Sequence, residues 1–401
     1  MAGHGIARAL GAIGLLLLAG CAPIHIASRT IDFGFGPPSQ TPANPPASAP
    51  AAGRRFGHGP VQVALLLPLT GNPALAAVGQ SMANGSELAM AFIESNPNIA
   101  ENTTITLLDT GGTVEGATAA TNRAITAGAK LILGPLRGDS VSAAGAMARS
   151  AGIPMIGFSN NPTAAVPGVY LLSVLPDMEM RRALNAVKAS GRRGVAGVFP
   201  SSAYGQAQQT AFRQQAIAAG LNPAAVYTFS SPAEAQQIVA QALPLIKRGM
   251  IDTLLLPDRA TAPAFAGQLA QAGVTPAEVQ IVGSADWEGD STILATPALV
   301  GAIYPAVDPA GMAAIRGDYQ ARFNSQPHAL VTIAYTATIL ANVNTLSMAN
   351  PPYNAALMTS PTGFSGRDGV FRFNRDGRSE YALAIMRVAA GGAVRVEGPK
   401  L

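Results

Sequence analysis

Histidine and cysteine supply most metal ligands and many nucleophiles in proteins, and this 401-residue chain has few of either. His328 is the only histidine beyond residue 60, so a His-rich zinc site or a Ser/His/Asp hydrolase would depend on that one imidazole. Cys21 is the only cysteine. The sequence therefore predicts no disulfide framework, no thiol nucleophile, no metal site, no cofactor and no enzymatic activity in the folded part of the chain.

The charge balance argues against nucleic acid as a partner. Lys and Arg number 26 against 22 Asp and Glu, but four of the Arg residues precede residue 60 and Asp32 is the only acid there. The remainder carries 22 basic and 21 acidic groups, so the sequence pI of about 9.4 belongs to the N-terminal segment. Such a balance gives no reason to expect a basic surface that binds the phosphates of nucleic acid.

The N-terminus has the pattern of a signal peptide. Residues 1 to 20 contain Arg8 and a compact apolar stretch that is too short to cross about 30 Å of hydrocarbon. The run Leu18, Ala19, Gly20, Cys21 resembles the lipobox of bacterial lipoproteins, in which the cysteine is acylated. The alternative is a buried cysteine after an apolar run. Because residue 22 is Ala rather than Asp, the resemblance implies a lipid anchor in the outer membrane, with the protein facing the periplasm.

Residues 21 to 59 read as a lipidated, Pro-rich tether. Six prolines fall between positions 37 and 50, among small and polar residues. This composition favours extended polyproline II at about 3.1 Å per residue. A Pro-rich ligand for a partner protein is the alternative, although no basic or aromatic residue lies among the prolines at 37–50.

From residue 61 the chain alternates apolar strands with helices. Strands are predicted at residues 61–67, 104–108, 130–133, 153–156, 194–198, 225–228 and 253–256, with helices between most of them. This pattern predicts an α/β protein with two doubly wound parallel-sheet lobes. The loops after these strands, where such sheets bind ligands, contain hydroxyls, amides and a few charges. They match neither the P-loop nor the G-x-S-x-G pattern.

Several segments together resemble the type I periplasmic-binding-protein superfamily. They are VALLLPLTG (63–71), LLDTGG (107–112), LILGPL (131–136), GIPMIGFSN (152–160), SSAYGQ (201–206) and the terminal GRDGVFRFNRDG (366–377). The segments LLLPLTG, DT and GPL are most similar to those of the penicillin-binding protein activator lipoproteins. They are second most similar to those of the branched-chain amino-acid receptors of ABC importers. The resemblance covers residues 60 to 401.

The resemblance implies two lobes joined by three crossovers. Lobe 1 is expected at residues 60–172 and 308–360, and lobe 2 at residues 175–304 and 364–401. The crossovers are expected near 171–178, 303–309 and 360–368, where prolines interrupt regular structure.

The resemblance also implies a ligand site at the strand-end loops. Amino-acid receptors hold an α-carboxylate with hydroxyls and backbone N–H groups, and an α-ammonium with an acid of the second lobe. The gripping hydroxyl falls at Gly138 and the acid at Ala285, next to Asp286, so two expected contacts are missing. Arg137 is an alternative carboxylate clamp, unless it belongs to a solvated loop. The complete candidate set is Thr70, Arg137, Gly138, Ser140, Ser159, Asn161, Tyr204, Asp258, Asp286 and Trp287.

Three of the predicted features have competing interpretations. Trp287, the only tryptophan, fits a cleft wall, a partner contact or a core ring. Acids at 286–290 and 374–380 hint at calcium, but Asp376–Gly377 reads better as a hairpin turn. His328 reads as a helix-terminal or core residue rather than a catalytic one.

Two functions follow from these observations. The first is an outer-membrane lipoprotein that regulates a peptidoglycan synthase, a penicillin-binding protein, through its tethered two-lobed body. The second is a substrate-binding lipoprotein of an ABC importer for branched-chain amino acids or related small molecules in its cleft. The tether and the lipobox favour the first, and the missing contacts at Gly138 and Ala285 weigh against amino-acid binding.

Overall fold

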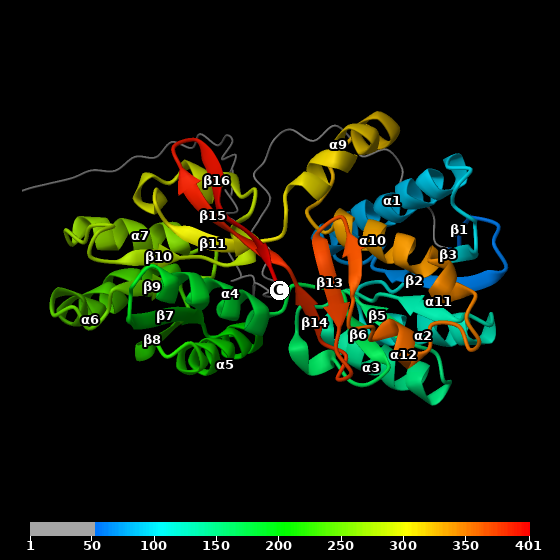
Figure 1. The fold of residues 1–401 in the computed structure, drawn as a ribbon, viewed down its shortest axis with the longest axis horizontal. Coiled ribbons are helices and arrows are strands. Elements are labelled where there is room, and N and C mark those ends of the chain that lie inside the picture. Colours follow the sequence, from blue (N-terminus) through cyan, green and yellow to red (C-terminus); the bar gives the residue numbers. More distant parts are fainter. Residues whose placement is uncertain (1–52) are drawn as a thin grey trace, which may run out of the picture. The chain divides into compact units, whose positions relative to one another are not determined.

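The computed structural model describes residues 53–401, which form three β-sheets and the helices packed on them (Figure 1). The predicted signal peptide, the predicted acylation site at Cys21 and the prolines at 37–50 lie outside the described residues. Within the described part of the chain, no helix combines the length and the apolar character needed to cross a membrane.

The first lobe is built around a six-stranded sheet of order β1-β3-β2-β4-β5-β6, parallel except at the β1 edge. Its first elements are β1 (Arg55–Phe56), β2 (Val61–Leu67), α1 (Pro73–Ser95), β3 (Thr103–Asp109), α2 (Val114–Thr126), β4 (Leu131–Leu133), α3 (Gly138–Ser150), β5 (Met155–Gly157), η1 (Pro162–Ala164) and β6 (Val169–Leu171).

The second lobe is built around a seven-stranded sheet of order β16-β15-β11-β10-β9-β7-β8. Strand β15 is antiparallel to both of its neighbours, β11 and β16. Its elements are α4 (Pro176–Ala189), β7 (Gly194–Pro200), α5 (Ala203–Ala218), β8 (Asn222–Phe229), η2 (Pro232–Glu234), α6 (Ala235–Lys247), β9 (Thr253–Leu255), α7 (Ala262–Gln271), β10 (Gln280–Val282), η3 (Ala285–Trp287), α8 (Ser291–Ala295), η4 (Pro297–Leu299), β11 (Ile303–Ala306), β15 (Leu383–Ala389) and β16 (Gly392–Lys400).

Strand β7 shows why an uninterrupted apolar run forms the centre of this sheet. Ala196 and Val198 belong to the core beneath α6 and α7, whereas Val195 and Phe199 belong to the core beneath α4 and α5. Successive side chains alternate between the two faces, and both faces are covered. The predicted α/β fold with two doubly wound parallel-sheet lobes is confirmed.

The chain returns to the first lobe after β11. The returning segments are α9 (Ala310–Phe323), α10 (Val331–Asn342), α11 (Asn344–Ser347), α12 (Ala355–Met358), β12 (Phe364–Gly366), β13 (Gly369–Phe373) and β14 (Ser379–Tyr381). Helix α10 packs closely on α1. The packing requires glycine at position 85, since a Cβ there would come within 2.5 Å of a methyl carbon of Val331.

The third sheet, β12-β13-β14, differs from the predicted division of the chain. Residues 364–401 were expected in lobe 2, but Phe371, Phe373 and Tyr381 pack in the core of lobe 1. The chain enters the second sheet only at Leu383. The third crossover therefore lies at residue 382 rather than at 360–368, because the aromatic side chains of this sheet are buried against lobe 1.

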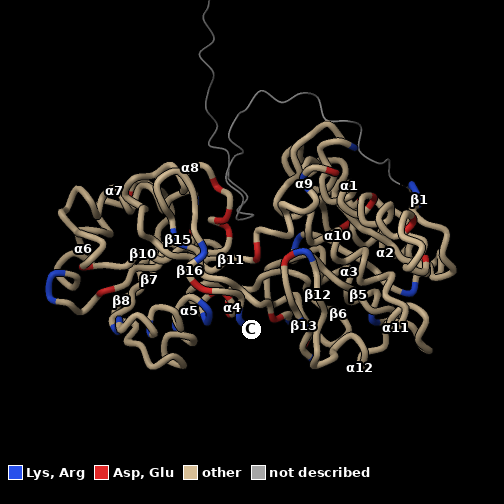
Figure 2. The backbone as a smooth tube through the Cα atoms, turned by 45° about the horizontal axis from the view of Figure 1, so that its top comes forward, with Lys and Arg blue, Asp and Glu red and all other residues tan. Residues whose placement is uncertain are grey.

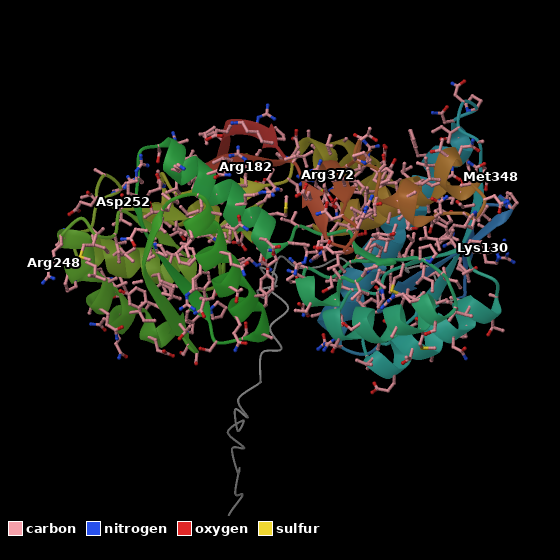
Figure 3. All side chains as sticks on the ribbon, turned by 60° about the horizontal axis from the view of Figure 1, so that its bottom comes forward. Lys130, Arg182, Arg248, Asp252, Met348 and Arg372 are labelled. Atoms are coloured by element: carbon pink, nitrogen blue, oxygen red, sulfur yellow. The ribbon has the colours of Figure 1, made fainter. Side chains whose placement is uncertain are left out.

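The C-terminal hairpin β15–β16 is held to α4 by Arg182 (Figure 3). Its Nε donates to the carbonyl of Leu383 at 2.7 Å, and its Nη2 donates to Glu397 at 3.0 Å. Only 9 % of the Arg182 side chain is exposed, so these bonds form largely out of water.

The tether ends earlier than predicted. Arg55 and Phe56 form β1, which pairs antiparallel with Thr106 and Ile105 of β3. Phe56 is buried, and its burial explains why this short segment joins the sheet. Residues 53–59, assigned to the tether from their composition, therefore belong to the folded body.

Candidate functional site

The loops after β4 and β5 bring three of the predicted site residues together. Gly138 begins α3, and a Cβ placed on it would lie 3.0 Å from Cβ of Asn161 and 3.2 Å from Oγ of Ser159. Ser159 is buried and accepts the N–H of Asn161 at 3.1 Å. Asn161 accepts two bonds from Thr163, which fixes its side chain at the start of η1.

Arg137, predicted as a carboxylate clamp, is engaged by its neighbour Asp139. Its Nε and Nη2 donate to the two carboxylate oxygens of Asp139 at 3.1 and 2.7 Å. The hydrogen bond from Arg137 holds the pKa of Asp139 below its usual value, although burial opposes the shift. A ligand carboxylate would have to compete with Asp139 for this guanidinium, so Arg137 contributes to the site through a pair rather than alone.

The remaining candidates of the first lobe lie in the same group of loops. Ser140 is buried in the first turn of α3, where its N–H and Oγ donate to Asp139. Thr70, in the loop after β2, donates to Asp109 at 2.6 Å. Asp109 also accepts the N–H groups of Leu69 and Gly111, so it fixes the loops after β2 and β3 to each other.

Glu179, in the first turn of α4, is a residue that sequence analysis missed. Its Oε1 accepts the N–H of Ala285 at 2.9 Å, and its Oε2 has no hydrogen-bond partner among the described residues. Burial, and then the carboxylate of Asp286, raise the pKa of Glu179 to about 8. A buried acid next to a second acid favours one shared proton or a bound cation. An acid of another element, α4, therefore lies beside Ala285, where the resemblance predicts one.

Acidic residues continue along the loop that precedes α8, which Figure 2 shows as a run of red segments. Asp286, Glu288 and Asp290 lie there at alternate positions. Glu288 accepts the phenol of Tyr304 at 2.9 Å, and burial raises its pKa. Asp290 instead caps α8 by accepting the N–H groups of Thr292 and Ile293. Only the first part of this run thus adjoins the buried Glu179.

Trp287, predicted among the site residues, is a core residue. Its side chain is 0 % exposed and packs in the core of lobe 2, with its ring centroid 6.0 Å from that of Tyr304. A Cβ at Gly283 would collide with the indole, so only glycine fits at this position, four residues before Trp287. Of the three interpretations of Trp287, the core ring is therefore the one that the structure supports.

Tyr204, Asp258 and His328 occupy the ends of helices. Tyr204 is half-buried in the first turn of α5. Asp258 accepts both the N–H and the hydroxyl of Thr261, which fixes the turn before α7. His328 lies before α10, where its Nδ1 accepts the N–H of Leu330 and burial lowers its pKa to about 4. Of the two interpretations, helix-terminal or core, the helix-terminal one is confirmed.

The second segment considered for calcium, at residues 374–380, contains a hairpin turn, as predicted. Asn374 donates its N–H to the carbonyl of Arg378, and Gly377 adopts a φ of 89°. Asp376 accepts the N–H of Arg378 and so closes the turn between β13 and β14.

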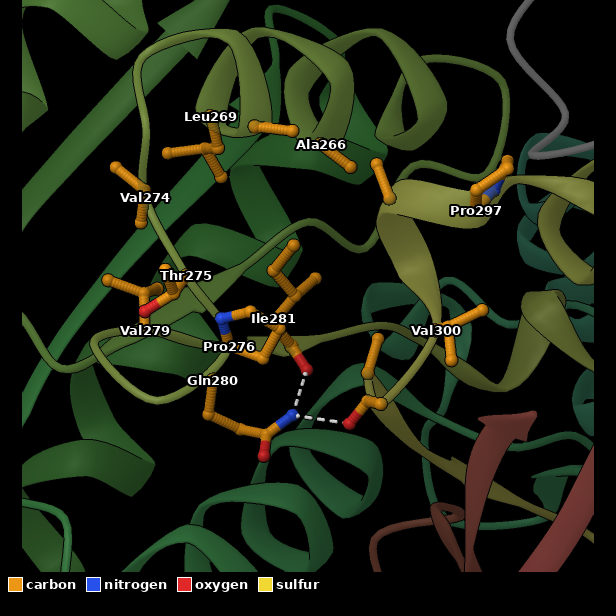
Figure 4. Close-up of a pocket in the computed structure, with 14 residues that line it drawn as sticks. Ala266, Leu269, Val274, Thr275, Pro276, Val279, Gln280, Ile281, Pro297 and Val300 are labelled. Carbon is orange, nitrogen blue, oxygen red and sulfur yellow. Dashed lines mark hydrogen bonds between the residues drawn. The ribbon is translucent and has the colours of Figure 1, made fainter. Parts of the chain in front are cut away.

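One pocket of about 190 Å³ lies in lobe 2, away from these loops (Figure 4). It is lined by α7, the chain before β10 and η4, including Leu269, Val274 and Pro297. Gln280 closes its floor by donating to the carbonyls of Ile281 and Gly301. The pocket lies at the amino end of β10, whereas ligands of such sheets meet the carboxyl ends of the strands.

Solved structures share this fold over nearly their whole length. A solute-binding protein of an ABC transporter from R. palustris in complex with benzoate is 20% identical, with a TM-score of 0.61, and the match covers 86% of this chain and 98% of that one. A substrate-binding protein from Desulfitobacterium hafniense in complex with Leu has 15% identity and a TM-score of 0.65, with 84% and 99% covered. A leucine-binding protein from Thermotoga maritima has 18% identity and a TM-score of 0.60, with 85% and 99% covered.

At these identities the likeness extends to the fold alone. No curated protein matches the sequence. A sequence profile described as periplasmic binding protein matches residues 60–393, which includes both lobes and every candidate site residue discussed above. The chain therefore belongs to the periplasmic binding protein family.

Proposed function

We propose that the protein is a solute-binding protein of an ABC importer, and that its ligand carries a cationic or hydrogen-bond-donating group that binds the Glu179–Asp286 acid pair. The observation that carries the proposal is the buried, unsatisfied Oε2 of Glu179 at the ligand-binding end of the second sheet. Solved relatives of this fold hold leucine or benzoate, which supports a small carboxylate-bearing solute. This is the second of the two functions expected from sequence.

The two lobes would contribute opposite ends of the site. In lobe 1, the first turn of α3 presents backbone N–H groups beside the hydroxyl of Ser159 and the amide of Asn161. A helix N-terminus with hydroxyl and amide donors suits an anionic group. In lobe 2, the acid pair suits an ammonium group. A small amino-acid-like zwitterion of this class satisfies both ends.

A ligand screen tests this proposal. The purified protein is screened by thermal denaturation with leucine, isoleucine, benzoate, 3,4-dihydroxybenzoate and amines that lack a carboxylate. A ligand at one hundred times its Kd stabilises the folded state by about 2.7 kcal/mol. The Glu179→Gln variant should lose the response to amine-bearing ligands, whereas Glu115→Gln, an exposed acid in α2, should keep it.

The pH dependence of the ligand affinity distinguishes a ligand with an ammonium group from a neutral ligand. At pH 6 the acid pair holds a proton that an ammonium ligand must displace, so the affinity should rise as the pH approaches 8. Glu179→Gln should flatten this rise. A response to benzoate alone, unchanged in the variant, would contradict the assigned role of the acid pair.

Regulation of a peptidoglycan synthase was the first function expected from sequence, and its support comes from the lipobox, the Pro-rich tether and the resemblance of a few short segments. The same features fit an importer protein held to the membrane by a lipid on Cys21, which we include in the proposal. Co-purification of the membrane-extracted protein separates the two: an ABC permease supports the import role, and a penicillin-binding protein supports the regulatory one.

A further inference from the structure

The junction between the N-terminal segment and lobe 1 contains a group of side chains that the proposed function does not use. His58, Glu94 and Glu101 each place one ligand atom within 4.8 Å of the others. They come from three different elements: the segment after β1, the last turn of α1 and the loop before β3. Such convergence of one imidazole and two carboxylates matches the ligand types of transition-metal ions.

The backbone around His58 is fixed on both sides. Arg55 and Phe56 pair with β3, and Gly59 donates its N–H to the carbonyl of Thr103. The carbonyl of Gly59 accepts the hydroxyl of Thr104 at 2.7 Å. His58 itself donates its N–H to Oε1 of Glu101. The imidazole, 87 % exposed, therefore extends into solvent from a well-held backbone.

The spacing of the imidazole and the nearer carboxylate fits a shared ion. Nδ1 of His58 lies 3.4 Å from Oε1 of Glu101. Two ligands on a tetrahedral zinc ion at bond lengths of about 2.0–2.1 Å lie roughly 3.3 Å apart. A zinc ion could therefore bind both atoms with little movement of either side chain.

Glu94 supplies an independent reason to expect a cation here. It lies in the last turn of α1, where the helix dipole disfavours a carboxylate, and that turn contains no basic residue. Within residues 53–401, Glu94 forms no ion pair or hydrogen bond with another side chain. A positive ion at its carboxylate would remove this unfavourable arrangement.

We infer that His58, Glu94 and Glu101 form a binding site for a transition-metal dication, with Zn²⁺ as the best match. Solvent supplies the fourth ligand, because two of the three side chains are exposed. The bound ion would join the segment that follows the Pro-rich stretch to α1 and β3 of lobe 1. The site would thus add a second attachment of this segment to lobe 1, beside the pairing of β1 with β3.

Titration with ZnCl₂ tests the inference. The protein is purified without a histidine tag, treated with a chelator, and titrated by calorimetry with ZnCl₂ and separately with MgCl₂. One equivalent of Zn²⁺ should bind, and Mg²⁺ should not compete at tenfold excess. Hydrogen exchange at the Gly59 N–H should slow when Zn²⁺ is bound, because that amide lies next to the site.

Two variants and two controls complete the experiment. His58→Gln and Glu94→Gln should each weaken Zn²⁺ binding by at least tenfold, and both change exposed side chains that leave the fold intact. His25→Gln and Glu115→Gln should leave the affinity unchanged. Loss of binding in His25→Gln, retention of the parent affinity in His58→Gln, or equal binding of Mg²⁺ would overturn the assignment.

Discussion

The carboxylate of Glu179 accepts the N–H of Ala285 at 2.9 Å, which joins the first turn of α4 to the loop after β10. This bond brings a buried acid next to Asp286, at the place where an amino-acid receptor would hold an ammonium group. A carboxylate, which Ala285 lacks in its own side chain, is therefore placed beside it by a residue 106 positions earlier in the chain.

The raised pKa of Glu179 predicts a specific dependence of stability on pH. The folded state keeps a proton between about pH 4.5 and 8, whereas the unfolded chain has lost it. The free energy of unfolding should therefore fall as the pH rises through this window, by up to about 1.4 kcal/mol for each pH unit. Glu179→Gln should flatten this fall in urea denaturation curves, and Glu115→Gln should reproduce the parent slope. If the pH dependence of the free energy of unfolding is unchanged in Glu179→Gln, a group other than Glu179 holds the proton.

Trp287 should report a buried environment. As the only tryptophan, it gives all of the tryptophan fluorescence, and its 0 % exposure predicts a blue-shifted emission that iodide does not quench. Trp287→Ala should destabilise the protein by about 3–5 kcal/mol, because it leaves a cavity in the core of lobe 2. Efficient quenching of the native protein by iodide would contradict the core assignment.

Arg182 should stabilise the C-terminal hairpin. Arg182→Met keeps much of the side-chain volume but leaves the carbonyl of Leu383 and the carboxylate of Glu397 without this donor. Loss of these charge-assisted bonds should cost about 2–3 kcal/mol in urea denaturation. Arg149→Met, at the exposed end of α3, is the matched control and should change stability by less than about 0.5 kcal/mol. Equal effects of the two substitutions would mean that the bonds of Arg182 contribute nothing net.

The proposed lipid anchor has a direct test. Cys21→Ala removes the acylation site and leaves the residues of the folded body unchanged, so the variant should be soluble or remain uncleaved. The measurement is the distribution of the protein between membrane and soluble fractions, with separation of inner and outer membranes by density. A variant that still fractionates with outer membranes would rule out anchoring through Cys21.

The parallel strands could be predicted from the sequence because both faces of each strand are buried, so apolar runs such as residues 61–67 stand out from their surroundings. The third crossover could not, because Phe371 and Phe373 alternate like residues of any half-buried strand, and only tertiary packing assigns them to lobe 1. Glu179 was missed because nothing near it in sequence marks it. Its role arises from its contact with Ala285. His58 was missed because composition placed it in the tether.

The last prediction concerns Gly138, where the resemblance to amino-acid receptors predicts a hydroxyl. A Cβ at this position would lie 3.0 Å from Cβ of Asn161 and 3.2 Å from Oγ of Ser159, so Gly138→Ala requires these two side chains to shift by a few tenths of an ångström. Gly267, inside α7, provides the matched control, because a Cβ there has no atom within 4 Å.

Replacing a helical glycine by alanine normally stabilises a protein by about 0.5–1 kcal/mol, and Gly267→Ala should do so because the added Cβ meets open space. Gly138→Ala should gain nothing or lose stability, since the helix preference is offset by the crowding at Asn161. Gly138→Ala should also lower the affinity for the ligand identified in the thermal screen by at least fivefold, while Gly267→Ala leaves that affinity unchanged. If both alanine variants are stabilised equally and bind the ligand like the parent, the loops after β4 and β5 do not hold the ligand, and the anion end of the site must be sought on other loops of lobe 1.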